Sequence, residues 1–144
     1  MCYNCCGDVM KEKSCGAIIF KEENDELKFL LVHQHNGHFS FPKGHMEKNE
    51  TEIETALREI KEETNLDAKL DTNFRVLISY FMESKNTVKE AVYFIGTPLS
   101  NVLKSQEGEI LNCDWYSYDE VMEKLEFDNI KDVFIKAHKY IKNI

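Results

Sequence analysis

The segment from Gly44 to Leu66 concentrates carboxylates in a stretch of sequence that can form a helix. The charged residues that attract attention are Glu50, Glu54, Arg58, Glu59, Glu62 and Glu63. Glu59 and Glu63 are four residues apart, so on a helix they lie on one face, one turn apart, with Glu62 beside them. Like charges at this spacing repel each other unless a cation neutralises them. Mg2+ and Mn2+ prefer carboxylate oxygens and suit such a face.

A solvated acidic surface is the simpler explanation of the same residues. Two features of the sequence argue against it. The acids alternate with Ile53, Ala56, Leu57 and Ile60, whose spacing is that of a helix packed on a core. The segment is also entered through the run Phe41 to Gly44, Phe-Pro-Lys-Gly. A helix anchored on one side holds its carboxylates in place on the other, as a binding site requires.

The order of these residues resembles the signature box of the Nudix hydrolases. Gly44 is followed after five residues by Glu50, and after seven more by the run REIKEETNL, which begins at Arg58. One position departs from the family pattern, because Asn65 stands where the family usually has glycine. A helix end needs a left-handed residue there, and asparagine is the common substitute for glycine in that conformation. We therefore expect Asn65 to be tolerated.

The resemblance implies hydrolysis of a nucleoside diphosphate linked to another group, by attack of water on a phosphorus of the pyrophosphate chain. It implies Glu59 and Glu63 as the principal ligands of Mg2+ or Mn2+, Glu62 as a further or water-mediated ligand, and the Lys43 carbonyl as a backbone ligand. Arg58 is expected to orient the neighbouring acids. Bound cations would neutralise phosphate oxygens, activate water and stabilise the leaving group.

One acid outside the box is a further catalytic candidate. In many Nudix hydrolases a glutamate six residues before an aromatic residue lies over the metals, and Glu109 stands at that distance from Trp115. Glu107 is the competitor, but it precedes Gly108, whereas Glu109 is followed directly by the expected strand. The alternative is that both are ordinary loop acids.

From Ser14 to about Tyr140 the chain is similar to the asymmetric diadenosine tetraphosphate hydrolases, through the segments SCGAIIF, FPKGH, ETALREIKEET, FRVLISY and KEAVYF. This resemblance implies that Tyr80 stacks on adenine, that Lys43 contacts phosphate, and that Phe39 supplies a second stacking or wall surface. Core packing is the alternative for each aromatic. Phe81 should point to the opposite face of the strand, so a shift of one residue would exchange it with Tyr80.

Three functions are compatible with these patterns. The first is metal-dependent cleavage of diadenosine tetraphosphate to ATP and AMP. The second is hydrolysis of nucleoside triphosphates, modified nucleotides or RNA 5′ ends by the same chemistry. The third is a non-catalytic nucleotide sensor, which the complete set of box carboxylates disfavours because a binder has no need of them.

The hydrophobic pattern predicts one α/β domain over residues 14–144, an α/β/α sandwich around a mixed sheet, which is also the Nudix fold. The expected strands are 15–20, 27–34, 74–82, 90–96 and 109–116, and the expected helices after the box are 118–125 and 129–141. The polar segment 21–26 predicts a hairpin or a longer turn. His138 is expected to pack in the core rather than to bind a ligand.

Cys2, Cys5, Cys6 and Cys15 crowd the first fifteen residues. Residues 1–13 are expected to form an arm that carries the first three, and Cys15 is expected to open the first strand. These thiols could bind zinc, although a closed site needs four ligands at suitable spacing, or could belong to a loose arm. The five cysteines suit a reducing compartment. The charge of −8 argues against binding to extended nucleic acid and is compatible with a small nucleotide bound through metal. We expect a cytoplasmic protein without a membrane segment, and the oligomeric state is left open.

Overall fold

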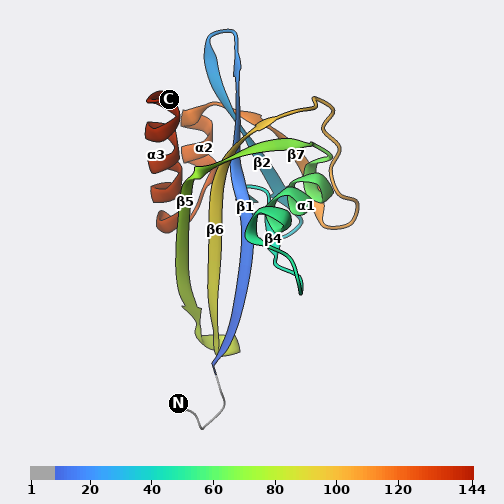
Figure 1. Cartoon of the computed structure of the whole chain (residues 1–144), viewed down its shortest axis with the longest axis vertical. Helices are drawn as coiled ribbons and strands as arrows, with labels where there is room; N and C mark the ends of the chain where they lie inside the picture. Colours follow the sequence, from blue (N-terminus) through green and yellow to red (C-terminus); the bar gives the residue numbers. More distant parts are fainter. Residues whose placement is uncertain (1–8) are drawn as a thin grey trace.

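The computed structural model describes residues 9–144 as one mixed β-sheet with helices on both faces (Figure 1). The strands are β1 (Met10–Glu23), β2 (Glu26–Gln34), β3 (Phe39–Ser40), β4 (Lys43–His45), β5 (Ala68–Met82), β6 (Thr87–Pro98) and β7 (Ile110–Tyr116). The helices are α1 (Glu52–Thr64), the 3-10 turn η1 (Glu83–Lys85), α2 (Tyr118–Lys124) and α3 (Asp128–Lys142). Within residues 9–144, none of these helices combines the length and the apolar character of a membrane span.

The strands follow the order β3-β2-β1-β6-β5, while β4 pairs with β1 and β7 pairs with β2. The long central pair, β1 and β6, is parallel from Met10 opposite Thr87 to Ile19 opposite Gly96. All other strand pairs are antiparallel, so the sheet is mixed, as the sequence predicted.

Alternate residues of the strands supply two separate cores, because successive side chains of a strand point to opposite faces. On one face, Ala17 and Ile19 of β1 pack with Ile60 of α1. On the other face, Ile18 packs with residues of α2 and α3, among them Phe134. Figure 1 shows α1 on one side of the sheet and α2 and α3 on the other. The predicted α/β/α sandwich is confirmed.

Several strands are longer than the hydrophobic pattern indicated. β1 begins at Met10 rather than at residue 15, β5 at Ala68 rather than 74, and β6 runs from Thr87 to Pro98. The reason is that main-chain pairing continues beyond the helix-covered core, where polar side chains interrupt the apolar pattern. The turn between β1 and β2 is a tight two-residue hairpin, since Asn24 and Asp25 both have positive φ, at 54° and 65°.

The beginning of β1 lies inside the segment expected to be an N-terminal arm. Cys2, Cys5 and Cys6, and with them the zinc hypothesis, lie outside the described residues. Cys15 is a buried free thiol in β1, on the face covered by α1. It therefore packs as a small apolar residue within the sheet.

The acidic helix α1 is defined by local signals at both ends. Thr51 caps its N-terminus in a reciprocal capping box with Glu54, so Glu50 lies just before the helix. Asn65 ends the helix in the left-handed conformation, with φ of 70°, and its N–H donates to the Lys61 carbonyl. The expectation that asparagine would replace glycine at this position is confirmed.

Candidate active site

The carboxylates of α1 lie against strand β4, and two close contacts hold them there. The Lys43 N–H donates to Glu63 Oε1 at 3.0 Å, and Glu63 is only 7% exposed. One residue further along β4, Gly44 faces Glu59. A Cβ at Gly44 would lie 2.0 Å from the carboxyl carbon of Glu59, so the absence of a side chain at Gly44 makes room for that carboxylate.

Arg58 connects the acids of the segment. Its Nε donates to Glu50 Oε2 at 2.6 Å, and its Nη1 donates to Glu59 Oε2 at 2.7 Å and to Glu62 Oε1 at 3.1 Å. Its Nη2 reaches the His45 carbonyl at 2.9 Å, next to β4. Arg58 therefore restrains three carboxylates and ties α1 to β4, which is the geometry of an orienting residue.

Glu50 has a different environment from the other acids. Besides Arg58, its carboxylate accepts the Glu47 N–H at 2.9 Å and the Thr55 hydroxyl at 2.9 Å. The hydrogen bonds from Arg58, followed by that from the Glu47 N–H, lower the pKa of Glu50 to about 2. With its oxygens already engaged, Glu50 braces the start of α1 and fixes Arg58.

Glu63 and Glu59 are carboxylates whose negative charge is disfavoured by their surroundings. Burial raises the pKa of Glu63 to about 8, against the opposing hydrogen bond from Lys43. Burial also raises the pKa of Glu59, although Arg58 opposes the shift. The negative charge of Glu109 raises the pKa of both groups further. An incoming divalent ion would relieve this repulsion and the cost of burying Glu63 as an anion.

The donor atoms fit a hard divalent cation, because they are carboxylate oxygens from one helix face beside the half-buried strand β4. Among residues 9–144, no three acidic, histidine or cysteine side chains already form a closed metal-binding group. Glu59 and Glu62 instead turn toward Arg58. These two side chains would have to rotate partly away from Arg58 to bind a cation together with Glu63.

The segment between β6 and β7 brings Glu109 to the site. The Lys104 N–H donates to the Thr64 carbonyl at 3.0 Å, and the Asn65 side chain donates to the Val102 carbonyl at 3.0 Å. These bonds attach the segment to the C-terminal end of α1 and leave Glu109 exposed near Glu59 and Glu63. The catalytic role of Glu109 stays a prediction, and the attachment of this segment to α1 was not predicted from sequence because it joins residues far apart in the chain.

Tyr80 is 47% exposed on β5, opposite Lys89 of β6. Burial lowers the pKa of Lys43, Glu63 opposes this shift, and the charge of Lys89 lowers the pKa further. Gly16 of β1 pairs with both Lys43 and Tyr93, and Lys89 is four residues before Tyr93 on β6. By this register, Tyr80, Lys89 and Lys43 lie on one face of the sheet. Phe81 points to the opposite face, as expected. Lys89 was not identified from sequence, because only the strand register places it beside Tyr80.

Phe39 is packed within the protein. Its ring stacks on His33, with centroids 4.1 Å apart and planes 4° from parallel, and contacts Tyr116 edge-on at 6.1 Å. The ammonium of Lys124 lies 4.7 Å from its centroid. The Phe39 ring already has aromatic and cationic partners on α2 and the neighbouring strands.

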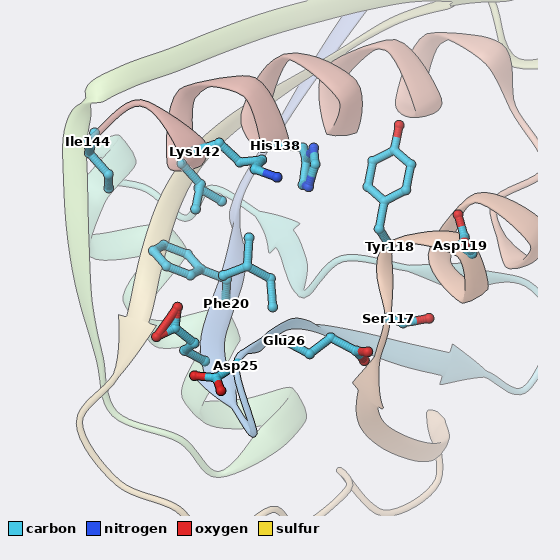
Figure 2. A pocket seen from close by; sticks show the side chains of 12 residues that line it. Phe20, Asp25, Glu26, Ser117, Tyr118, Asp119, His138, Lys142 and Ile144 are labelled. Carbon is cyan, nitrogen blue, oxygen red and sulfur yellow. The ribbon is translucent and has the colours of Figure 1, made fainter.

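A cavity of about 670 Å3 lies elsewhere, between the β1–β2 hairpin and the end of α3 (Figure 2). Phe20, Tyr118 and His138 line it, and no residue of α1 does. His138 packs against Tyr118, with ring centroids 4.4 Å apart, and burial lowers its pKa. The predicted packing role of His138 is confirmed, and this cavity is separate from the acidic helix.

The fold and the site together define a class: an α/β/α sandwich around a mixed sheet, with a helix whose carboxylates suit a divalent cation. Comparison with known families identifies it, since the model of the NUDIX domain matches residues 10–137. The chain therefore belongs to the Nudix family, and it is a Nudix hydrolase, an enzyme that acts on phosphoanhydride bonds.

Curated relatives match nearly the whole chain. A pig protein named asymmetrical bis(5′-nucleosyl)-tetraphosphatase is 32% identical, over 92% of this chain and 97% of its own length. A probable DHNTP pyrophosphohydrolase of Lactococcus lactis is also 32% identical, over 91% of this chain and 73% of its own length.

The fold has counterparts among solved structures. A C. elegans Ap4A hydrolase in a binary complex superposes with a TM-score of 0.84 at 20% identity, over 92% of this chain and 99% of that one. The predicted family and fold class are confirmed.

Proposed function

We propose that this enzyme hydrolyses diadenosine tetraphosphate to ATP and AMP with Mg2+ or Mn2+ bound at α1. The observation that carries the choice of substrate is the near-full-length similarity to a protein named asymmetrical bis(5′-nucleosyl)-tetraphosphatase. The observation that supports the chemistry is the buried Glu63 beside Glu59, at a strand whose backbone donates to it.

The roles of the chain's own residues follow from their positions. Glu59 and Glu63 would hold the cation, with Glu62 as a further ligand and the Lys43 carbonyl as a backbone one. The bound cation would neutralise phosphate oxygens and lower the pKa of a coordinated water. Arg58 orients the acids. Glu109 would accept a proton from the attacking water; its exposure and its electrostatic influence on Glu59 and Glu63 support this role.

The nucleotide would lie across the sheet face that carries Tyr80. Lys43 and Lys89 are cations on this face and would contact phosphates. Tyr80, about half exposed, would stack on one adenine. Phe39 would form a wall rather than an open stacking platform, because its ring is already stacked on His33.

A second reaction is favoured by a specific observation. The Lactococcus relative, similarly identical, is named as a probable DHNTP pyrophosphohydrolase. The yeast mRNA-decapping enzyme subunit 2 is 29% identical over 85% of this chain and 12% of its own length. The alternative function is therefore hydrolysis of nucleoside triphosphates or RNA 5′ ends at the same carboxylates. A non-catalytic nucleotide sensor is disfavoured by the complete carboxylate set.

A panel of substrates tests these proposals. Purified enzyme with Mg2+ or Mn2+ is given diadenosine tetraphosphate, nucleoside triphosphates and capped RNA, and the products are separated by chromatography. ATP and AMP appearing fastest from the dinucleotide support the first proposal. Pyrophosphate appearing faster from a triphosphate would replace it with the second, and binding without turnover would indicate a sensor. Reaction in 18O-labelled water identifies the phosphorus attacked.

Matched variants test the site. Glu63→Gln and Glu59→Gln should each lower kcat by at least about 100-fold without loss of the fold, since each removes a metal ligand. Glu123→Gln, an exposed acid on α2, is the control. Glu109→Gln should lower kcat much more than Glu107→Gln in the same loop. Near-wild-type turnover of both α1 variants would overturn the site assignment.

The compartment is also part of this proposal. Cys15 and Cys113 are free thiols among the described residues, which suits the reducing conditions of the cytoplasm. We propose that the enzyme works there on small nucleotides rather than on extended nucleic acid, in keeping with its charge of −8.

A further inference from the structure

The free edge of β5 has the properties of a self-association surface. β5 is the last strand in the sheet order, and among the described residues no strand pairs with its outer edge. Figure 1 shows its lower part extending past α3 along the side of the sheet. An edge strand presents unpaired N–H and C=O groups that can pair with another chain.

The sequence of this edge lacks the usual protection. Residues 76–82 read VLISYFM, without a charge or a proline. Leu77, Tyr80 and Phe81 are 40%, 47% and 53% exposed. Natural edge strands are normally protected by charged residues, prolines or bulges. The irregularity in the pairing of β5 lies before Val76, so 76–82 is a regular strand.

We propose that a second copy of this chain binds here, β5 against β5 in antiparallel orientation, so that one sheet continues across a two-fold axis. The observation that selects a second copy is the self-complementarity of the sequence. A two-fold axis perpendicular to a sheet keeps each side chain on its own face, so paired residue numbers must add to an even total. The axis must therefore lie midway between one residue of the strand and the same residue of the partner subunit, and that residue defines the position of the axis.

With the axis at Ser79, the apolar residues meet apolar residues. On the face covered elsewhere by α1, Leu77 lies opposite Phe81 of the partner subunit. On the opposite face, which α2 and α3 cover elsewhere, Ile78 lies opposite Tyr80 of the partner subunit. At the ends of the ladder Val76 comes opposite Met82 of the partner subunit, so all seven residues from 76 to 82 are paired.

The neighbouring registers are less favourable. With the axis at residue 78, Arg75 would lie opposite Phe81 of the partner subunit. With the axis at residue 80, only residues 78 to 82 could pair, because β5 ends at Met82. The first register places a charge against an apolar side chain and the second shortens the ladder, so the register at Ser79 is preferred. A single strand pair forms a small interface, and we therefore expect a reversible dimer at micromolar or higher concentration.

The first measurement is sedimentation velocity of the full chain at concentrations from low to high micromolar. Wild type should shift from monomer to dimer. Phe81→Lys and Leu77→Glu should each remain monomeric, because each places a charge against an apolar residue of the partner. Leu111→Lys is the matched control, since Leu111 is a 48% exposed residue on strand β7, remote from this edge. Circular dichroism checks the fold of each variant.

Mixing the two variants tests the register itself. In a heterodimer of Phe81→Lys with Leu77→Glu, the introduced lysine and glutamate lie opposite each other, while the second Leu77–Phe81 pair is intact. The dimer should therefore return in the mixture, and native mass spectrometry should show one copy of each. A wild type that stays monomeric, variants that still dimerise, loss of the dimer in Leu111→Lys, or no heterodimer would overturn the proposal.

Discussion

Substituting Gly44 by alanine should lower the activity of the enzyme while leaving its stability nearly unchanged. The new Cβ would lie 2.0 Å from the Glu59 carboxyl carbon, whereas ordinary contact begins at 3.4 Å. The Glu59 carboxylate must therefore move by about 1.4 Å if the backbone of β4 is to stay in place, as the contact distances require. The atoms that collide belong to the flexible end of a side chain, so the fold can accommodate the change.

The expected cost falls on catalysis. A displacement of about 1 Å in a reacting constellation can cost about 100-fold in rate, equivalent to about 2.7 kcal/mol of transition-state stabilisation. We expect kcat of Gly44→Ala to fall by about this factor. The concentration of Mg2+ or Mn2+ needed for half-maximal activity should rise. The midpoint of thermal unfolding should change by less than about 3 °C.

The assay is turnover of the preferred nucleotide across a titration of the divalent cation, with Glu59→Gln and the double variant measured in parallel. If Gly44 acts through Glu59, Gly44→Ala should lower kcat by less than about twofold when it is added to the Glu59→Gln variant. Activity of Gly44→Ala within about threefold of wild type, or a full additional loss in the double variant, would refute the reasoning.

Three further predictions concern binding, pH and helix stability. Tyr80→Ala should raise KM about tenfold and change kcat by less than about twofold, measured by initial rates. Phe81→Ala should leave KM and kcat of the dilute enzyme unchanged in the same assay. Hydrogen bonds, first from Arg75, lower the pKa of Glu52 from 4.5 to about 2, so its stabilisation is present above pH 4.5 and is lost as pH falls toward 2. The difference in unfolding midpoint between wild type and Glu52→Gln should therefore shrink over this range. Thr51→Ala should lower the free energy of unfolding in urea by about 1 kcal/mol through loss of the helix cap.

Features that depend on neighbouring residues in the chain could be predicted from sequence. The acidic helix, its asparagine C-cap at Asn65 and the hairpin around Asn24 follow from helical periodicity and from residues that tolerate positive φ. The grouping of Glu59, Glu62 and Glu63 on one face follows from the pitch of a helix. Such local preferences act through short-range sterics and hydrogen bonds, which the chain carries with it into any fold.

The ends of β1, β5 and β6 could not be predicted in the same way. Their pairing continues through polar stretches such as Met10 to Ser14, where hydrophobic periodicity is weak. The energy of that pairing comes from main-chain hydrogen bonds, to which almost every residue type can contribute.

The chemistry of the site was decided by tertiary structure. Sequence places Glu63 among several similar acids, but only packing against β4 buries it and raises its pKa to about 8. The same packing places Gly44 in contact with Glu59. The charge of Glu109 acts on both Glu59 and Glu63. The free edge of β5 likewise exists only because no strand lies beyond it in the described sheet. Burial and electrostatic neighbours depend on residues distant in the chain, so no local pattern could specify them.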